Sequence, residues 1–321
     1  MKAYDITALG EILIDFTPSG ISAGGRNMFE ENPGGAPANV AAAAAKLGAK
    51  SAFIGKTGSD QFGRDARTAL ESCGVYTGAM KTDDAHHTTM AFVTLSPSGE
   101  RSFSFARNGG ADIMLSPEDI DRDLIGSSTF LHIGSLSLTC EPSHSATLEA
   151  LRAAKKAGTF VSYDPNWRAP LWSSRETGIA VMKSLFQYAD FVKISDNELE
   201  LIYGENNPGA AQTILDQGVK LVCVTLGKDG VFYKTSDYEG IISIPEYDIQ
   251  TVDTTGAGDS FTGALLYRLT RRENPFSFTQ NELEEDLNFA NAAATVCVSR
   301  RGAIPALASL AEVTSLMETR R

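Results

Sequence analysis

Cysteine is scarce in this chain of 321 residues. The few cysteines lie far apart, with neither the short spacing of a zinc site nor the dense pattern of a disulfide framework. Both of those architectures are therefore excluded. We expect reduced thiols, most of them in the core, at Cys73, Cys140, Cys223 and Cys297.

Positive charge is also scarce. Lys and Arg number 28 against 40 Asp and Glu, which gives a formal net charge of −12. Such a surface repels polyanions, so neither nucleic acid nor an anionic membrane is expected as the main partner. A small phosphorylated ligand stays compatible with this charge, because the field that acts on it comes from groups close by.

Long apolar runs are missing as well. No stretch approaches the length of a membrane span, and Asp5 and Glu11 interrupt the region where a signal peptide would be apolar. We therefore expect a cytoplasmic protein with no membrane partner.

Two familiar phosphate-binding motifs are absent. The spacing of Gly256, Gly258 and Gly263 is not that of the dinucleotide fingerprint. Lys50 stands where a P-loop ending in Gly55-Lys56-Thr57 would need its first glycine. Neither a Rossmann dinucleotide site nor a P-loop is predicted.

Short β-rich runs alternate with helical runs along most of the chain, which is typical of parallel βαβ units. The near-continuous apolar run 221–225 indicates a strand buried on both faces. We predict an α/β fold with a mostly parallel, helix-covered sheet. The expected strands are 5–16, 51–54, 129–133, 159–163, 190–194 and 221–225, and the expected helices are 37–47, 61–73, 143–157, 173–188 and 281–298.

One region departs from this alternation. The strand-like runs 88–95 and 101–107 are separated by Ser96-Pro97-Ser98-Gly99-Glu100, a hairpin pattern with no helix between the strands. Residues 12–32 are too rich in glycine and polar groups for a crossover helix. These segments could pair as a small sheet that closes over a site and excludes water. A hairpin without function and a dimer contact are the alternatives.

This pattern divides the chain into a core and a lid. The discontinuous β lid comprises residues 12–36 and 87–110, and the α/β core comprises residues 1–11, 37–86 and 111–321.

The segment from Thr251 to Ala264 predicts a strand, a turn and a helix. Glycines at the turn, at 256 and 258, let backbone N–H groups approach an anion at the positive end of the helix. Asp259 beside this anion hole would repel phosphate. It is better suited to accept a proton from a hydroxyl that attacks phosphate. An ordinary helix-capping charge is the alternative.

A second glycine-rich turn, Gly34-Gly35-Ala36-Pro37-Ala38-Asn39, precedes the first helix. Its exposed amides and the side chain of Asn39 suit sugar hydroxyls better than a second phosphate. Asp15, at the end of the first strand run, could accept from two neighbouring hydroxyls or serve only as a turn former.

Both turns match known signatures. Residues 34–41, with Gly48 and Gly58 at the expected distances, and residues 253–264 resemble the two motifs of the ribokinase/PfkB-type carbohydrate kinases. The likeness runs from about residue 5 to 312 in family order. Segments 10–15, 132–137 and 164–172 resemble the fructokinase branch most closely, although ketodeoxygluconate kinases share part of the last motif. The resemblance implies a three-layer α/β/α core, ribokinase-like, with a small β-sheet lid.

The resemblance also implies roles for particular residues. Asp259 would be the catalytic base, and the amides of Gly256, Ala257 and Gly258 would stabilise the transferred phosphoryl group. The sugar would be held by Asp15, Gly34, Gly35, Asn39 and Arg107, with Asn166 and Arg168 near the sugar or the phosphates. ATP would lie against Thr225, Gly227, Lys228, Gly230 and Asn291, although for Lys228 alone a solvated turn charge is the favoured interpretation.

Two cation sites are implied in the same way. Glu198 matches the acid of the family's Asn-x-x-Glu motif, which organises Mg²⁺ through water. Ser195 replaces the asparagine, and its hydroxyl could still bind a water or a phosphate. Asp253 and Thr255, with carbonyls around 297–302, resemble a monovalent-cation loop, which implies K⁺.

The expected function is ATP-dependent phosphorylation of a sugar hydroxyl, with fructose as the acceptor and fructose 6-phosphate as the product. A 2-keto-3-deoxygluconate kinase and a nucleoside or ribose kinase are the alternatives within the family. A non-catalytic sugar- or nucleotide-binding sensor is the alternative from another class. The hairpin would, in a further hypothesis, form a homodimer through the lid.

The base assignment gives a direct prediction. Asp259→Asn should reduce turnover by several orders of magnitude and leave ATP binding largely intact, because an amide cannot accept the proton. Steady-state kinetics with ATP titration calorimetry would measure both. Wild-type turnover in the variant would contradict the assignment.

Overall fold

The computed structural model describes residues 2–95, 101–204 and 208–319. Its centre is an eight-stranded sheet in the order β14-β13-β12-β11-β10-β9-β1-β4. The strands β4, β1, β9, β10, β11 and β12 run parallel to one another. At the other edge β13 pairs antiparallel with β12, and β14 pairs antiparallel with β13. Their bounds are Tyr4–Leu9 (β1), Ser51–Ile54 (β4), Ser128–Gly134 (β9), Phe160–Asp164 (β10), Phe191–Ser195 (β11), Leu221–Thr225 (β12), Val231–Lys234 (β13) and Glu239–Ile242 (β14).

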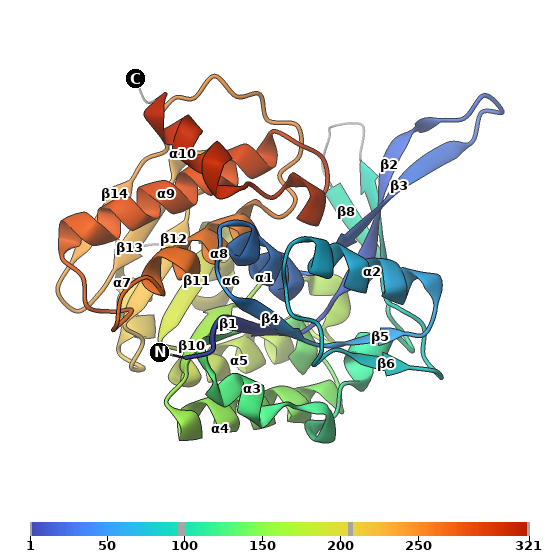
Figure 1. Ribbon diagram of the computed structural model, residues 1–321, viewed down its shortest axis with the longest axis horizontal. Coiled ribbons are helices and arrows are strands. Elements are labelled where there is room, and N and C mark those ends of the chain that lie inside the picture. The colour runs from blue at the N-terminus through green and yellow to red at the C-terminus, as the bar shows by residue number, and fades with distance from the viewer. Residues whose placement is uncertain (1, 96–100, 205–207, 320–321) are drawn as a thin grey trace.

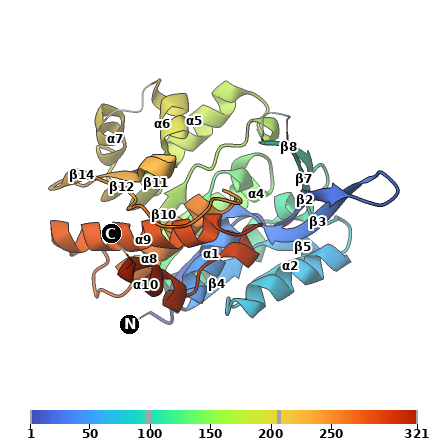
Figure 2. The same ribbon diagram turned by 90° about the horizontal axis from the view of Figure 1, so that it is seen from above.

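Helices cover both faces of this sheet, as Figure 2 shows from above. One face carries α1 (Ala36–Lys46), α8 (Ala257–Leu269), α9 (Gln280–Val298) and α10 (Leu310–Glu318). The other carries α3 (Arg122–Gly126), α4 (Ser143–Ala157), α5 (Arg175–Leu185), α6 (Asp196–Tyr203) and α7 (Pro208–Leu215). A further helix, α2 (Gln61–Ser72), packs on the β4 side. The predicted three-layer α/β/α fold is confirmed.

The layers follow from the strand sequences. In β12, Val222 and Val224 join the apolar cluster on the α4 side of the sheet, whereas Leu221 and Cys223 join the cluster on the α9 side. Successive side chains of a strand point to opposite faces, so a continuous apolar run is stable only between two helix layers. Each of the larger side chains contributes about 1.5–3 kcal/mol by its burial.

A separate four-stranded sheet has the order β3-β2-β7-β8. It is built from β2 (Leu13–Ile21), β3 (Asn27–Gly34), β7 (Met90–Leu95) and β8 (Arg101–Ala106), with β2 and β7 parallel and the other pairs antiparallel. Figure 1 shows the β2–β3 ribbon extending away from the core. The pairing predicted between residues 12–32 and the hairpin is thus present, while the predicted turn at 96–100 lies outside the described residues. The small parallel pair of β5 (Lys56–Gly58) and β6 (Lys81–Asp83) was not predicted.

The single strand expected over residues 5–16 is two strands, β1 and β2, in different sheets. The chain turns at Gly10, which has a φ of 152°. A Cβ there would lie 2.6 Å from Cγ of Pro37, so only glycine lets the first turn of α1 pack this closely. This break sends β2 out of the core and into the small sheet.

The prediction of a strand at 251–253 is wrong. The backbone is extended there, but the N–H groups of Val252 and Asp253 donate to the carbonyl of Val298, at the end of α9, at 2.8 and 3.2 Å. Val252 is 52% exposed. The β-branched run has a helix end rather than a strand edge beside it, so the motif is loop, turn and helix.

No helix in the described part of the chain is long and apolar enough to cross a membrane.

The fold places two tryptophans against a glycine. Trp167 and Trp172 stack with ring centroids 6.0 Å apart, and a Cβ on Gly178 of α5 would lie 2.3 Å from the ring of Trp167. We expect Gly178→Ala to destabilise the protein by about 1–3 kcal/mol and shift tryptophan fluorescence, because the rings must move. Urea unfolding measures both. Gly126→Ala is the matched control, since its Cβ would meet only Ala157 at an ordinary 3.5 Å; equal unfolding midpoints for the two variants would contradict the prediction.

Candidate active site

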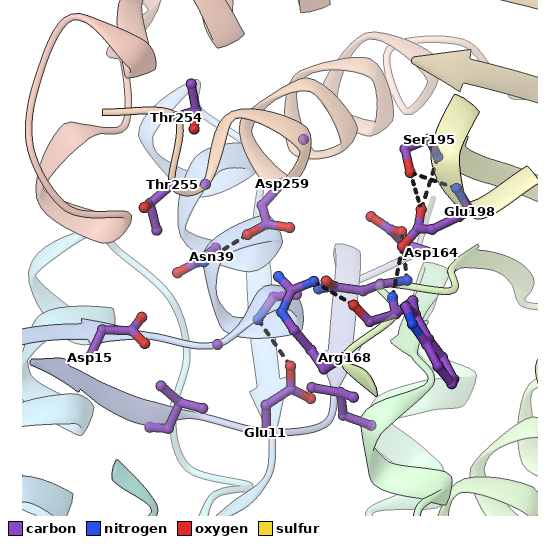
Figure 3. Close-up of a pocket in the computed structure, with 18 of the residues that line it drawn as sticks. Glu11, Asp15, Asn39, Asp164, Arg168, Ser195, Glu198, Thr254, Thr255 and Asp259 are labelled. Carbon is purple, nitrogen blue, oxygen red and sulfur yellow. Dashed lines mark hydrogen bonds between the residues drawn. The ribbon is translucent and has the colours of Figure 1, made fainter. Parts of the chain in front are cut away.

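A cavity of about 620 Å³ opens at the carboxyl ends of the parallel strands. Ligands commonly bind at this edge of an open α/β sheet. Polar side chains dominate its wall, as Figure 3 shows. They come from Glu11, Asp15, Asn39, Asp164, Asn166, Arg168, Lys193, Ser195, Glu198, Thr254, Thr255 and Asp259.

The predicted anion hole lies in this wall. Gly256, with a left-handed φ of 77°, precedes the first residue of α8, and no side chain caps the helix. The N–H of Ala257 makes a long contact of 3.3 Å to the carbonyl of Thr254. For Gly256 and Gly258 the described part of the chain supplies no acceptor. Unpaired N–H groups and the positive helix end together favour an anion.

Asp259 follows in the first turn of α8. Its Oδ2 accepts a hydrogen bond of 2.7 Å from Nδ2 of Asn39, drawn in Figure 3. Burial raises the pKa of Asp259, while the Asn39 hydrogen bond and the positive charges of Lys193 and Arg168 oppose the rise. The carboxylate therefore faces the cavity as a stronger base than an ordinary aspartate.

The second glycine-rich turn lies against Asp15 and Glu11. A Cβ on Gly34 would lie 2.6 Å from Oδ2 of Asp15, and one on Gly35, whose φ is 116°, would lie 2.5 Å from the Glu11 carbonyl oxygen. Gly35 is therefore required by its approach to the backbone, whereas a side chain at Gly34 would displace the Asp15 carboxylate. Burial raises the pKa of Asp15 to about 7, and Arg168 opposes the rise.

Asn166 and Arg168 follow β10 and both line the cavity. Asn166 adopts a φ of 45°, which a non-glycine residue rarely does, and its N–H donates to Oδ1 of Asp164 at 3.2 Å. This turn directs the chain so that Arg168 points into the cavity, above Glu11 in Figure 3. The position fits a group that contacts a sugar or a phosphate.

Arg107 was expected to reach the sugar from the lid, but it is not among the residues that line the cavity. Its guanidinium is buried behind the wall and donates to Oδ2 of Asp112 at 2.7 Å, to Oγ1 of Thr139 at 2.9 Å and to the carbonyl of Leu136 at 2.9 Å. Leu136 does line the cavity. In this structure Arg107 supports the wall, and Phe105 is the residue of β8 that faces inward.

Three charged lining residues were missed from the sequence. Nζ of Lys193 lies 3.0 Å from Oδ2 of Asp164, and both side chains are buried. Burial raises the pKa of Asp164 to about 6, and Lys193 opposes it. The third residue is Glu11, whose Oε1 accepts from the N–H of Ala36 at 3.1 Å. Two signals were available for this pair: the lysine in the middle of an apolar strand, Phe191–Ser195, and the place of Asp164 at the start of the family-like segment 164–172.

Glu198 lines the cavity, and the described hydrogen bonds occupy both of its carboxylate oxygens. Oε2 accepts from the N–H and Oγ of Ser195 at 2.9 and 2.8 Å, and Oε1 accepts from the N–H of Trp167 at 2.7 Å. Ser195 and Glu198 thus form the capping box of α6. Burial favours the neutral acid, yet Lys193 and these hydrogen bonds hold the pKa of Glu198 below its ordinary value.

Asp253 joins two loops. Its Oδ1 accepts from the N–H of Thr255 at 2.7 Å, and its Oδ2 accepts from the N–H of Gly302 at 3.2 Å. The loop before α8 is thereby fixed to the turn after α9. The residues expected to form a cation loop do lie together.

The residues expected at the nucleotide lie outside the cavity lining. Thr225 ends β12, and Gly227 and Gly230 form the loop to β13. A Cβ on Gly230 would lie 2.0 Å from the carbonyl oxygen of Ile242. The same oxygen accepts a hydrogen bond of 3.4 Å from Nδ2 of Asn291. The structure therefore brings this loop, with Lys228, to the end of β14 and the face of α9.

An uncapped helix end beside a buried carboxylate, in a polar cavity at the edge of a helix-covered sheet, defines the class of α/β kinases that act on small hydroxyl compounds. The family model described as "pfkB family carbohydrate kinase" matches residues 4–309. The chain belongs to the pfkB family of carbohydrate kinases and is a sugar kinase.

Named relatives agree. The chain is 43% identical to fructokinase-2 of Oryza sativa subsp. japonica over 316 residues, which is 97% of this chain and 93% of the relative. Its fold is similar to the crystal structure of fructokinase from Xylella fastidiosa with bound ATP, with a TM-score of 0.91, 31% identity and 98% of both chains covered. It is also similar to fructokinase from Vibrio cholerae O395 in a form with fructose, ADP and calcium ion bound, with a TM-score of 0.87, 34% identity and 97% and 98% covered.

Proposed function

We propose that this protein transfers the γ-phosphoryl group of ATP to the 6-hydroxyl of fructose. The single observation that carries the proposal is the Asp259 carboxylate beside the uncapped end of α8, inside a cavity of about 620 Å³. The full-length likeness to fructokinases supports fructose as the acceptor.

The chemical step follows from this arrangement. The hydroxyl oxygen attacks the γ-phosphorus and forms the new O–P bond, while the bond from that phosphorus to the β–γ bridging oxygen breaks. The hydroxyl proton passes to the Asp259 carboxylate, and ADP leaves with the bridging oxygen. The amides of Gly256, Ala257 and Gly258 face the equatorial oxygens, where negative charge is shared during transfer. Most of the rate enhancement comes from positioning and electrostatics.

Substrate binding is assigned in the same proposal. Asp15, Gly34, Gly35 and Asn39 hold the sugar on the lid side of Asp259, and Asn166 and Arg168 lie across the cavity near the sugar and the phosphates. The loop of Thr225, Gly227, Lys228 and Gly230 holds the nucleotide together with Asn291. Arg107 acts through the wall at Leu136 rather than by direct contact with the sugar.

The cation sites belong to the proposal too. No group of three or more His, Cys, Asp or Glu side chains in the described part of the chain could by itself hold a metal. Mg²⁺ usually binds one or two carboxylates, waters and substrate phosphates, so this cavity fits an ion that arrives with ATP. Glu198 would contact its water shell, and the ion would neutralise phosphate charge. Asp253 and Thr255 would support K⁺, an ion that is bound in the crystal structure of a fructokinase double mutant from Vibrio cholerae O395.

The division into core and lid is part of this proposal. Residues 12–36 and 87–110 would close over the sugar, and residues 1–11, 37–86 and 111–321 would hold both substrates. Closure would keep water from competing as the phosphoryl acceptor. A cytoplasmic location is also proposed, because ATP and free sugars are both present there.

A panel of sugars tests the acceptor. We expect the highest kcat/KM on fructose in an ATP-coupled assay, with lower values on ribose, 2-keto-3-deoxygluconate and a nucleoside. Higher efficiency on ketodeoxygluconate would overturn the choice of sugar and leave the kinase assignment intact. Sugar and ATP binding without turnover on any member would favour the sensor alternative.

A homodimer through the lid is proposed from its exposed apolar side chains. Ile21, Met28 and Phe29, on β2 and β3, are 69%, 43% and 42% exposed. These strands project away from the core, as Figure 1 shows. Exposed apolar side chains on a projecting sheet are typical of a protein interface.

The proposed interface predicts that substitutions in the lid lower the molecular mass of the protein in solution. The wild-type protein should scatter light as a dimer, and Ile21→Glu with Phe29→Glu should scatter as a monomer, because charge would be buried at the contact. Ile241→Glu is the matched control, since Ile241 is 62% exposed on β14 of the core. A monomeric wild type, or an unchanged mass in the lid variant, would contradict the proposal.

A further inference from the structure

The contact between Asn39 and Asp259 joins two helices that are 220 residues apart in the chain. Asn39 lies in the first turn of α1 and is 4% exposed. Its Nδ2 donates to Oδ2 of Asp259 at 2.7 Å. Figure 3 shows this bond on the side of the cavity where Asp15 lies. The sequence suggested only a sugar contact for Asn39, so the bond to the base calls for an explanation.

The crossing of the two helices sets this bond. Gly263 lies one helical turn after Asp259, and Ala43 lies one turn after Asn39, so each pair shares a helix face. A Cβ on Gly263 would lie 2.7 Å from Cβ of Ala43 and 2.8 Å from the carbonyl oxygen of Val40. Only glycine permits this approach. The glycine–alanine contact therefore fixes the distance between Asn39 and Asp259.

The first turn of α1 is itself anchored. The N–H of Ala36 donates to Oε1 of Glu11 at 3.1 Å, and the N–H of Asn39 donates to the carbonyl of Gly35 at 2.8 Å. Asn39 therefore presents its amide from a fixed backbone. The amide orientation is also determined, since the opposite orientation would place Oδ1 against the carboxylate.

We propose that Asn39 is a positioning residue for the catalytic base, which holds Oδ2 of Asp259 so that Oδ1 is directed to the reacting hydroxyl. The inference rests on the proposed function, because it needs Asp259 to be the base. It goes beyond sugar binding by giving Asn39 a part in the transfer step. Gly263 contributes by setting the helix crossing.

The charges around Asp259 allow a pH test. A hydrogen bond donated to a carboxylate favours its ionised form, so loss of the Asn39 donor raises the pKa of Asp259. The base must be ionised to act. On lowering the pH, a variant without the Asn39 donor would therefore lose activity at a higher pH than wild type does. The other titratable groups that face Asp259 are Lys193 on β11, Arg168 and Asp164 at the end of β10, Glu198 on α6, Asp15 on β2 and Cys297 on α9.

The experiment measures kcat, both KM values and the pH profile of wild type, Asn39→Ala and Asn39→Asp, with folding followed by circular dichroism. We expect kcat to fall about ten- to a hundredfold in Asn39→Ala, because the base is no longer held in position. The low-pH limb should move to higher pH, and the KM for ATP should stay the same. Asn39→Asp keeps the size of the side chain but places a second carboxylate beside Asp259, and this like charge should move the limb further.

A second variant and its control complete the test. Gly263→Ala should lower kcat and move the low-pH limb to a smaller degree, because its Cβ separates the helices. Gly126→Ala on α3 is the control and should match wild type. If Asn39→Ala fails to fold, Asn39→Asp and Gly263→Ala are judged by the same criteria. Asn39→Ala should also cause no further loss of turnover in Asp259→Asn, since the two residues act as one unit.

The outcomes separate the two proposals. A raised sugar KM with a wild-type kcat and an unmoved pH limb would make Asn39 a sugar ligand only. An equal loss of turnover with and without Asp259 would also overturn the inference. If Asp259→Asn keeps wild-type turnover, the proposed base fails and this inference fails with it.

Discussion

The start of α8 is the constraint on which the site depends. Gly256 takes a left-handed conformation, and no side chain caps the helix that follows, so amides face the cavity where a capping serine or aspartate would otherwise stand. The same turn aims Asp259 inward. The proposed phosphate site and the proposed base are thus set by one backbone conformation, and the other elements would bring the sugar and the nucleotide to it.

Electrostatics would favour an added cation in this cavity when a polyphosphate is bound. The wall holds two positive side chains, Lys193 and Arg168, against five acidic ones: Glu11, Asp15, Asp164, Glu198 and Asp259. Burial raises the pKa of Asp15 and Asp164, which lessens the negative charge, while Lys193 keeps Glu198 ionised. A chelated Mg²⁺ would supply positive charge to balance these five carboxyl groups and a polyphosphate.

Much of the fold could be predicted because its strands and helices carry strong local patterns. The apolar run of β12 and the helix at Ser143–Ala157 were predicted with the bounds that the structure has. The extended run at 251–253 was mistaken for a strand because a β-branched sequence looks the same whether a strand or a helix end lies beside it. The pair of Lys193 and Asp164 was missed because a buried ion pair leaves no spacing pattern between two distant strands.

By itself the sequence determined the family, the two glycine-rich turns and the identity of the candidate base, because glycines at a turn and an acid in a first helical turn act through the local backbone. Only the tertiary structure decided which side chains meet. It placed Arg107 behind the wall, made Ser195 and Glu198 a helix cap, and brought Asn39 to Asp259. The physical reason is that these contacts depend on how closely separate helices and strands pack, as at Gly263, and that distance is a property of the whole fold.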